Sequence, residues 1–243
     1  MSTLATHGLI KRFGRTTVVD DVDATVSGGE IVGLLGPNGA GKTTCFYMIV
    51  GLVEADAGRI DINEADITHL PMHGRAQRGI GYLPQEASVF RNLSVQDNLL
   101  LAMQQSGYPE HLRRARLEEL VLDFQLERFL HRKGFQLSGG ERRRTEVARA
   151  LAVGPNGPRY LLLDEPVAGV DPLAVNDLQQ LIRGLRERGV GMLITDHNVR
   201  ETLAITDRAY ILTDGSILAS GPSEQVAHDP LVRRHYLGEG FQL

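Results

Sequence analysis

The chain has 243 residues, enough for one large domain or two small ones. Its 42% hydrophobic residues suffice for a packed core, and its net charge of −4 argues against a nucleic-acid binder, which would more often be strongly basic. Cys45 is the sole cysteine, which excludes an internal disulfide and favours a reducing compartment. No stretch approaches the roughly 18 to 20 apolar residues that cross a bilayer. The N-terminus carries no signal-peptide pattern. We therefore expect a cytoplasmic globular protein without direct membrane insertion, linked to any membrane through a partner.

Short apolar runs and amphipathic helical patterns alternate along the chain. In chain order, the sequence predicts a strand at Ile31–Leu35, a helix at Thr43–Val50, a short strand just before Gln85, helices at Asp97–Gln105, His111–Phe124 and Glu141–Ala152, a strand at Tyr160–Leu163, a helix at Ala174–Arg188, and strands at Gly191–Thr195 and Ala209–Leu212. Strands that alternate with helices are typical of an α/β fold with a mainly parallel, doubly wound sheet.

The pattern changes in the middle of the chain, where residues 92–152 contain helical patterns and no strand-like run. We interpret this stretch as a helical subdomain inserted into an α/β core that is formed by residues 1–91 and 153–225. The turn-rich segment Gly154–Pro158 ends the insertion. Residues 226–243 form a C-terminal tail, and the whole chain, 1–243, is expected to be one domain.

A glycine-rich run follows the strand Ile31–Leu35 and precedes a helix. It contains G-x-x-x-x-G-K-[ST], the phosphate-binding loop in which backbone N–H groups and a helix N-terminus face the phosphates. Lys42 is expected to reach the β- and γ-phosphates, and the Thr43 hydroxyl is expected to hold Mg²⁺. The alternative is a plain glycine-rich turn before a helix. The residues assigned to the nucleotide here are Gly36, Pro37, Asn38, Gly39, Ala40, Gly41, Lys42, Thr43 and Thr44.

Two carboxylates end the apolar strand Tyr160–Leu163. Asp164 is expected to lie beside the phosphate-binding loop and to hold magnesium, and Glu165 to act as the general base for the attacking water. On its own, such a strand end is as often a polar cap. The phosphate-binding loop earlier in the chain favours the catalytic interpretation.

Two further side chains follow predicted strands. Gln85 carries an amide that can bind Mg²⁺ and respond to the γ-phosphate, and His197 is placed to contact that phosphate and to orient Glu165. By itself, Gln85 would be read as an ordinary loop residue and His197 as a structural histidine. Their place among the other motifs favours a catalytic role.

The run Leu137–Glu141 reads LSGGE. Ser138 and Glu141 fit an S-x-x-E capping box, so the simplest interpretation is a capped helix start. With the phosphate-binding loop and the strand that ends at Asp164, the run also resembles the signature of the ABC ATPases. The resemblance covers nearly the whole chain and implies an N-terminal antiparallel β part. It also implies that Ser138, Gly139, Gly140 and Glu141 bind the γ-phosphate held by a second copy in an ATP-dependent head-to-tail dimer.

Other positions extend this resemblance. Phe13 lies where an aromatic ring stacks on adenine in the family, and Ala168–Asp171 resembles the D-loop at the dimer interface. The runs Arg78–Phe90 and Ile194–Leu203 are similar to the ATPases of bacterial lipopolysaccharide export systems. The alternative is the ATPase of a branched-chain amino-acid importer, which has a similar C-terminal tail.

The resemblance also implies cofactors and partners: ATP with Mg²⁺, a second copy of the chain, and two integral inner-membrane permease subunits at the cytoplasmic face. We place the docking site for the permeases near Phe90, which would serve as an apolar anchor in a groove. The alternative is that Phe90 belongs to the core of the helical subdomain.

Overall fold

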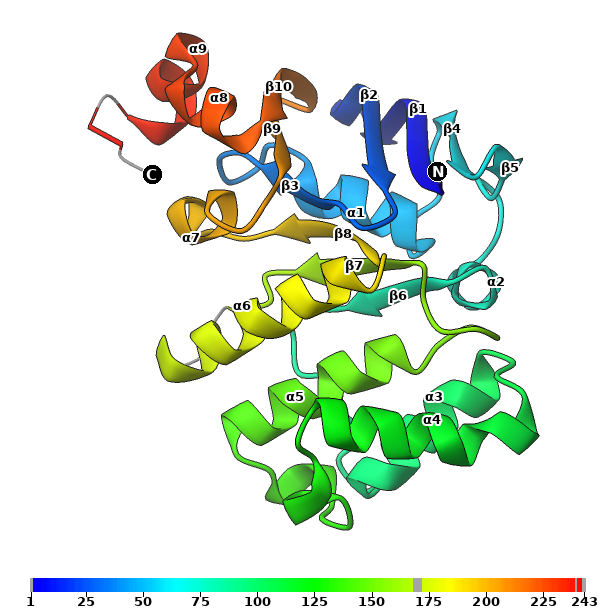
Figure 1. Cartoon of the computed structure of the whole chain (residues 1–243). Helices are drawn as coiled ribbons and strands as arrows, with labels where there is room; N and C mark the ends of the chain where they lie inside the picture. The colour runs from blue at the N-terminus through cyan, green and yellow to red at the C-terminus, as the bar shows by residue number, and fades with distance from the viewer. Residues whose placement is uncertain (1, 168–171, 239, 242–243) are drawn as a thin grey trace.

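The computed structural model describes residues 2–167, 172–238 and 240–241, and contains two β-sheets (Figure 1). The first sheet is antiparallel, in the order β2-β1-β4-β5. Its strands are β1 (Thr3–Phe13), β2 (Thr16–Ser27), β4 (Ala57–Ile62) and β5 (Ala65–Asp66). The expected N-terminal antiparallel part is confirmed.

The second sheet has six strands in the order β10-β9-β3-β8-β7-β6. Its members are β3 (Ile31–Leu35), β6 (Ile80–Leu83), β7 (Tyr160–Asp164), β8 (Gly191–Thr195), β9 (Arg208–Thr213) and β10 (Ser216–Pro222). All neighbouring pairs are parallel except β10 and β9. The mainly parallel sheet predicted from the sequence is therefore confirmed, with an antiparallel strand at one edge.

The helices cover both faces of the six-stranded sheet (Figure 1). They are α1 (Lys42–Val50), α2 (Met72–Gln77), α3 (Val95–Gln105), α4 (Glu110–Asp123), α5 (Gly139–Leu151), α6 (Pro172–Glu187), α7 (Val199–Leu203), α8 (Ser223–His228) and α9 (Pro230–Val232). Single 3-10 turns lie at Glu127–Phe129 and Gly134–Gln136, and a π-helical turn lies at Arg233–Leu237. Helix α1 packs between the two sheets, while α5 and α6 pack on the opposite face of the six-stranded sheet.

The central strand β7 shows how the sequence builds both cores. Its side chains alternate between the two faces because successive residues of a strand point in opposite directions. Tyr160 and Leu162 pack with α1 in one cluster, whereas Leu161 and Leu163 pack with α5 and α6 in the other. All four are fully buried, so β7 holds a fixed register and its C-terminal end is held rigidly.

Residues 92–152, all within the described part, hold α3, α4, α5 and the two 3-10 turns, and no strand. Figure 1 draws these helices in green below the six-stranded sheet. Helix α6 begins at Pro172 rather than Ala174, and two further helix starts also correct the sequence prediction. Helix α3 begins at Val95 rather than Asp97, and α5 begins at Gly139 rather than Glu141, because serine side chains cap both helices one residue before they start.

Candidate nucleotide-binding and catalytic site

The loop between β3 and α1 requires glycine at two places. Gly36 has φ 148°, and a Cβ there would lie 2.0 Å from the carbonyl oxygen of Leu212. Gly41 has φ 97°, and its Cβ would lie 2.4 Å from the carbonyl oxygen of Val18. Glycine therefore lets the loop turn tightly into α1, whose first backbone N–H groups lack partners within the helix. These groups and the helix dipole make the loop an anion site.

Lys42, the first residue of α1, folds back over this loop. Its Nζ donates to the carbonyl oxygens of Gly36 and Pro37 at 2.7 and 2.8 Å. Burial lowers the pKa of the Lys42 ammonium, and the nearby carboxylates of Glu165 and Asp164 oppose that shift. A cation thus lies between the glycine loop and the two acidic side chains.

Three of the predicted side chains meet at the carboxyl ends of β6, β7 and β8, where parallel strands end at one edge. Glu165 follows β7 and is 8% exposed. Its Oε2 accepts a hydrogen bond from Nε2 of Gln85 at 2.6 Å, and its Oε1 lies 2.6 Å from Nε2 of His197. The Glu165 carboxylate is therefore held from both sides, by an amide and by an imidazole.

Glu165 also has an uncommon backbone conformation, with φ 47°. Its N–H donates to the carbonyl oxygen of Thr195 at 2.8 Å, which ties the turn after β7 to the end of β8. Left-handed backbone at a non-glycine residue is sparsely populated and occurs often at functional sites. The turn aims the Glu165 side chain at His197 and Gln85.

Asp164 is almost fully buried at the end of β7. Burial and the neighbouring Glu165 carboxylate raise the pKa of its carboxyl group. The hydroxyl of Tyr82 approaches Asp164 Oδ2 only to 3.4 Å. Two buried carboxylates side by side favour a nearby cation. Among the described residues, no three His, Cys, Asp or Glu side chains gather as a metal site, so a cation here would rely on mixed oxygen donors such as the Thr43 hydroxyl.

The LSGGE run forms the start of α5. Ser138 Oγ accepts from the Glu141 N–H at 3.3 Å, and Glu141 Oε2 accepts from the Ser138 N–H at 2.9 Å, which confirms the capping box. A Cβ at Gly139 or Gly140 would meet no atom within 4 Å. The packing of this chain therefore does not require these glycines, and they leave the helix start open to another molecule.

Within one chain, the structure does not bring this run to the phosphate-binding loop. The pocket beside it is lined by Gln125, Glu127, Arg128, Phe129, Ser138, Gly140, Glu141 and Arg144, all from the helical region. Phe13 lies at the end of β1, 52% exposed, with the Lys11 ammonium 5.6 Å from its ring centre. The predicted D-loop, Ala168–Asp171, lies outside the described residues.

Phe90 is 50% exposed, so the interpretation of this residue as a core aromatic is wrong. It lies on an apolar groove of about 550 Å³ between α2, α3 and α5, whose lining includes Met72, Tyr82 and Leu101. The guanidinium of Arg149 lies 5.3 Å from the Phe90 ring centre. Ser88 and Phe90, which line the groove, follow Gln85 on the same loop.

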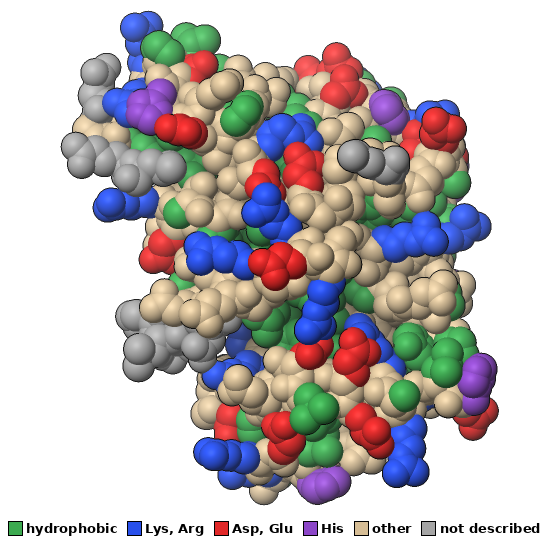
Figure 2. Space-filling model, viewed as in Figure 1, with side chains coloured by type: hydrophobic (Ala, Val, Ile, Leu, Met, Phe, Trp, Pro, Cys, Tyr) green, Lys and Arg blue, Asp and Glu red, His purple; other side chains and the backbone are tan. Residues whose placement is uncertain are grey.

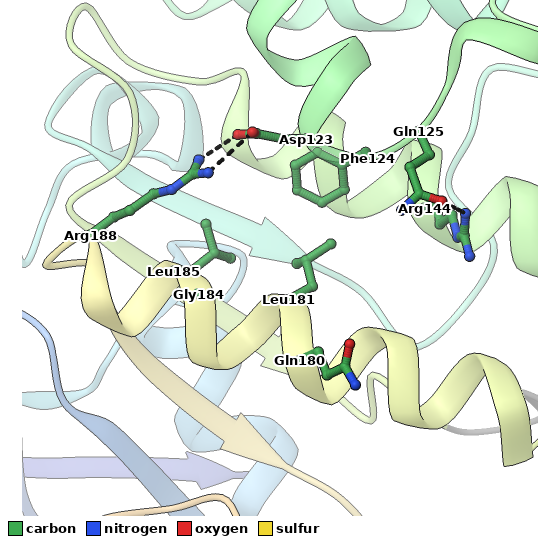
Figure 3. A pocket seen from close by; sticks show the side chains of 9 residues that line it. All are labelled: Asp123, Phe124, Gln125, Arg144, Gln180, Leu181, Gly184, Leu185 and Arg188. Atoms are coloured by element: carbon green, nitrogen blue, oxygen red, sulfur yellow. Dashed lines mark hydrogen bonds and ion pairs between the residues drawn. The ribbon is translucent and has the colours of Figure 1, made fainter.

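A separate cavity lies between the end of α4, α5 and α6 (Figure 3). Figure 3 shows Leu181 and Leu185 pointing from α6 towards Phe124, with an ion pair between Arg188 and Asp123 at one end. None of the predicted site residues lines this cavity. On the face drawn in Figure 2, acidic and basic side chains are interspersed rather than gathered by sign.

The sequence did not indicate the roles of two charged residues on α5, Arg143 and Glu146, whose side chains are 11% and 3% exposed. Both lie against the turn after β7 or the loop after β6. A signal was present for Glu146, because Ala150 lies four residues later on the same side of the helix, and that side is buried. Buried charges require partners, and the partners come from distant parts of the chain.

The sequence matches the family described as ABC transporter over residues 19–168. A second family, described as branched-chain amino acid ATP-binding cassette transporter, matches residues 216–242. No helix within the described ranges is both long and apolar enough to cross a membrane. The chain therefore belongs to the ABC transporter family, as an ATP-binding and ATP-hydrolysing subunit.

Two curated relatives within the ABC transporter family share a name that refers to lipopolysaccharide export. The chain is 54% identical over 244 residues to the lipopolysaccharide export system ATP-binding protein LptB of Escherichia coli K12, and the match covers 100% of both chains. It is 54% identical over 240 residues to the protein of the same name from Acidithiobacillus ferridurans, covering 99% of this chain and 98% of the relative.

Solved structures agree with the fold. The ADP conformation of MJ1267, an ATP-binding cassette of an ABC transporter, has 29% identity and a TM-score of 0.86, covering 98% of this chain and all of that one. The dimeric structure of MJ0796, a bacterial ABC transporter cassette, has 25% identity and a TM-score of 0.77, covering 90% of this chain and 98% of that one.

Proposed function

We propose that this chain is the ATPase subunit of a lipopolysaccharide exporter and that it powers the extraction of lipopolysaccharide from the inner membrane. The observation that carries the catalytic part is the Glu165 carboxylate, held by Gln85 and His197 beside the phosphate-binding loop. The full-length 54% identity to lipopolysaccharide export proteins supports lipopolysaccharide as the transported molecule. The domain division expected from the sequence, with a core of 1–91 and 153–225, an insertion at 92–152 and a tail at 226–243, is part of this proposal.

The substrate in this proposal is ATP. Its phosphates would lie in the loop Gly36–Thr44, where backbone N–H groups and Lys42 offset their charge. Phe13 would stack on the adenine, since its ring is exposed at the end of β1. The Lys42 ammonium, which now donates to carbonyl oxygens of the loop, would exchange them for phosphate oxygens.

Hydrolysis would proceed by attack of a water oxygen on the γ-phosphorus. The bond between that phosphorus and the bridging oxygen breaks, ADP leaves, and Glu165 accepts a proton from the water. Gln85 and His197 hold the two oxygens of Glu165, so the carboxylate needs little reorganisation before it acts. His197 would also donate to the γ-phosphate.

The oxygen donors near the loop fit Mg²⁺. Thr43, Gln85 and Asp164 would hold it, because a hydroxyl, an amide and a carboxylate that share a site with phosphate are donors that Mg²⁺ accepts. Burial and the Glu165 charge raise the pKa of the Asp164 carboxyl, so its ionised form is disfavoured unless a cation lies beside it. When bound, Mg²⁺ would offset the charge of the phosphate oxygens.

A second copy would complete each site. The pocket at Ser138, Gly140 and Glu141 contains no residue of the loop Gly36–Thr44, so this helix start, with Gly139, would serve the nucleotide of another chain. Such a dimer would be two-fold symmetric, with both nucleotides at the interface.

Two integral inner-membrane permease subunits would dock in the groove at Phe90, on the cytoplasmic face. The groove combines an exposed aromatic ring with apolar walls, the chemistry of a helix-accepting surface. The alternative function, the ATPase of a branched-chain amino-acid importer, has support from residues 216–242. The curated relatives, matched over their whole length, favour the exporter.

The test is transport by a reconstituted complex. The chain would be purified with its membrane partners, placed in lipid vesicles that contain lipopolysaccharide, and given ATP or ADP. We expect ATP, and not ADP, to drive release of lipopolysaccharide to an acceptor. A complex whose permeases move branched-chain amino acids, and leave lipopolysaccharide in the vesicle, would overturn the proposal.

A further inference from the structure

Helix α5 presents three charged side chains at intervals of one helical turn. Arg143, Glu146 and Arg149 are spaced three residues apart, so they lie along one side of the helix. Each of them bonds to residues outside the helical subdomain core, in the loop after β6 or in the turn after β7. This side of α5 therefore faces the catalytic edge and the Phe90 groove together.

Arg143 binds the backbone of both catalytic loops. Its Nε donates to the carbonyl oxygen of Pro166 at 2.9 Å, and its two terminal nitrogens donate to the carbonyl oxygens of Pro84 at 3.1 Å and Glu165 at 3.2 Å. A guanidinium offers donors in a rigid plane, which lets one side chain join three acceptors. The side chain is largely buried, since it is only 11% exposed.

These acceptors lie next to the residues that carry the chemistry. Pro84 precedes Gln85, and the Glu165 carbonyl belongs to the residue whose backbone has φ 47°. The Gln85 and Glu165 side chains meet at 2.6 Å, although they come from different strands. Arg143 thus fixes the backbone on both sides of that contact.

Glu146 extends the same connection towards the groove. It is almost fully buried, and its Oε1 accepts from the N–H groups of Ser88 and Val89 at 2.7 and 3.3 Å. Its Oε2 lies 3.4 Å from Arg143, and Arg149 donates to Ser88. The segment before Phe90 and the Glu165 turn are therefore attached to the same face of α5.

We infer that Arg143 is a positioning residue that sets the Glu165 carboxylate and Gln85 for hydrolysis and ties both to helix α5. Helix α5, capped by Ser138, thus binds both the Glu165 turn and the loop before Phe90. This inference rests on the proposed function, in which Glu165 accepts the proton of water.

The test compares two changes at Arg143. Arg143→Met keeps the length of the side chain and removes every donor, whereas Arg143→Lys keeps the charge but cannot span three carbonyl oxygens. Arg114→Met is the matched control, because Arg114 is 91% exposed on the same subdomain and pairs with Glu118 on its own helix. ATP affinity, steady-state turnover and melting temperature would be measured for all three.

If Arg143 positions Glu165, Arg143→Met should leave the ATP dissociation constant within about twofold and lower kcat by roughly 30- to 100-fold. Arg143→Lys should recover part of that loss, and Arg114→Met should match the wild type. A purely structural role would instead lower the melting temperature and ATP affinity together. Wild-type kcat in either folded Arg143 variant would overturn the inference.

A double-mutant cycle tests directly whether the effect of Arg143 on turnover acts through Glu165. In the Glu165→Gln background, Arg143→Met should lower the single-turnover rate by less than about threefold, since its effect acts through Glu165. The same fold loss in both backgrounds would show that Arg143 acts independently of Glu165 and would overturn the inference. If Glu165→Gln alone leaves turnover intact, the proposed function fails instead, so the two failures are distinct.

Discussion

His197 contacts Glu165 through Nε2 and Oε1 at 2.6 Å, and its side chain is 59% exposed while that of Glu165 is 10% exposed. The imidazole thus lies at the surface end of the site and the carboxylate at the buried end. Because the imidazole is exposed, few neighbouring atoms restrict it. It can therefore exchange its contact with the Glu165 carboxylate for a contact with a phosphate oxygen. From this arrangement we expect His197 to contribute to the rate of turnover rather than to ATP binding.

We expect His197→Ala to lower kcat by about 10²-fold and to leave ATP affinity within about threefold, because the glycine loop and Lys42 stay intact. Turnover and ATP binding would be measured on the purified chain. His69→Ala is the control, since His69 is a 79% exposed histidine away from the site. Equal losses in ATP binding and in kcat would contradict a role for His197 in the chemical step.

Ser138→Arg should prevent ATP-dependent dimerisation while ATP still binds each monomer. The bulk and charge would fill the open helix start at Gly139 and Gly140, where a Cβ now meets nothing. Size exclusion of the Glu165→Gln variant with and without Ser138→Arg gives the measurement.

The change also removes a helix cap, worth about 1 kcal/mol. Ser94→Arg controls for this loss, because Ser94 caps α3 in the same way and lies in the same subdomain. Dimers that persist with Ser138→Arg, or that are lost equally with Ser94→Arg, would contradict the assigned role of the signature.

Phe90→Ala should weaken binding of the permease subunits while leaving the folding stability of the chain nearly unchanged. Because Phe90 is half exposed, we expect the free energy of unfolding to change by about 1 kcal/mol or less, and isolated ATPase activity to be unchanged. Co-purification of the permease subunits should be lost. Phe135→Ala is the matched control, because Phe135 is an aromatic residue of similar exposure, 55%, that does not line the groove. Retained permeases in the Phe90 variant would contradict the docking proposal.

The sequence predicted that the candidate site residues meet at one edge of the sheet because each of them is marked locally. Gly36, Lys42 and Asp164 stand at fixed spacings beside apolar strands, and a parallel sheet brings strand ends together. Arg143 and Glu146 were not predicted, because their acceptors are backbone groups far away in the chain. No local pattern marks a backbone carbonyl as an acceptor.

The observed starts of α3 and α5 differ from the predicted ones because the apolar pattern does not mark the cap. Apolar periodicity begins only where a helix faces the core, whereas the cap fixes the first residue. Ser94 and Ser138 therefore decide the starts of α3 and α5, which begin two residues before the predicted starts at Asp97 and Glu141. The exposure of Phe90 depends on how α2, α3 and α5 pack, which the sequence leaves open.

The Arg188–Asp123 pair joins α6 to the end of α4 and makes stability depend on pH (Figure 3). The hydrogen bond from Arg188 lowers the pKa of the Asp123 carboxyl, so the folded state favours its ionised form. This stabilisation is present above the ordinary carboxyl pKa of about 3.9 and is lost as pH falls through the lower folded-state value.

At pH 7, Asp123→Asn should reduce the free energy of unfolding by about 0.2–1 kcal/mol, since the pair is partly exposed. The difference from wild type should shrink as the pH falls below about 4. Urea unfolding at several pH values would measure it, with Arg188→Gln expected to behave alike at pH 7. A difference that grows on acidification would contradict the assignment.

In the proposed mechanism, Glu165 is the general base, and the groups that bind the phosphates lie elsewhere in the site. The most direct measurement is phosphate release and ATP retention by Glu165→Gln beside the wild type. We predict that phosphate release falls by roughly 10²- to 10⁴-fold, while ATP remains bound in a dimer. Near-normal phosphate release by the Glu165→Gln chain would contradict the role of Glu165 as general base.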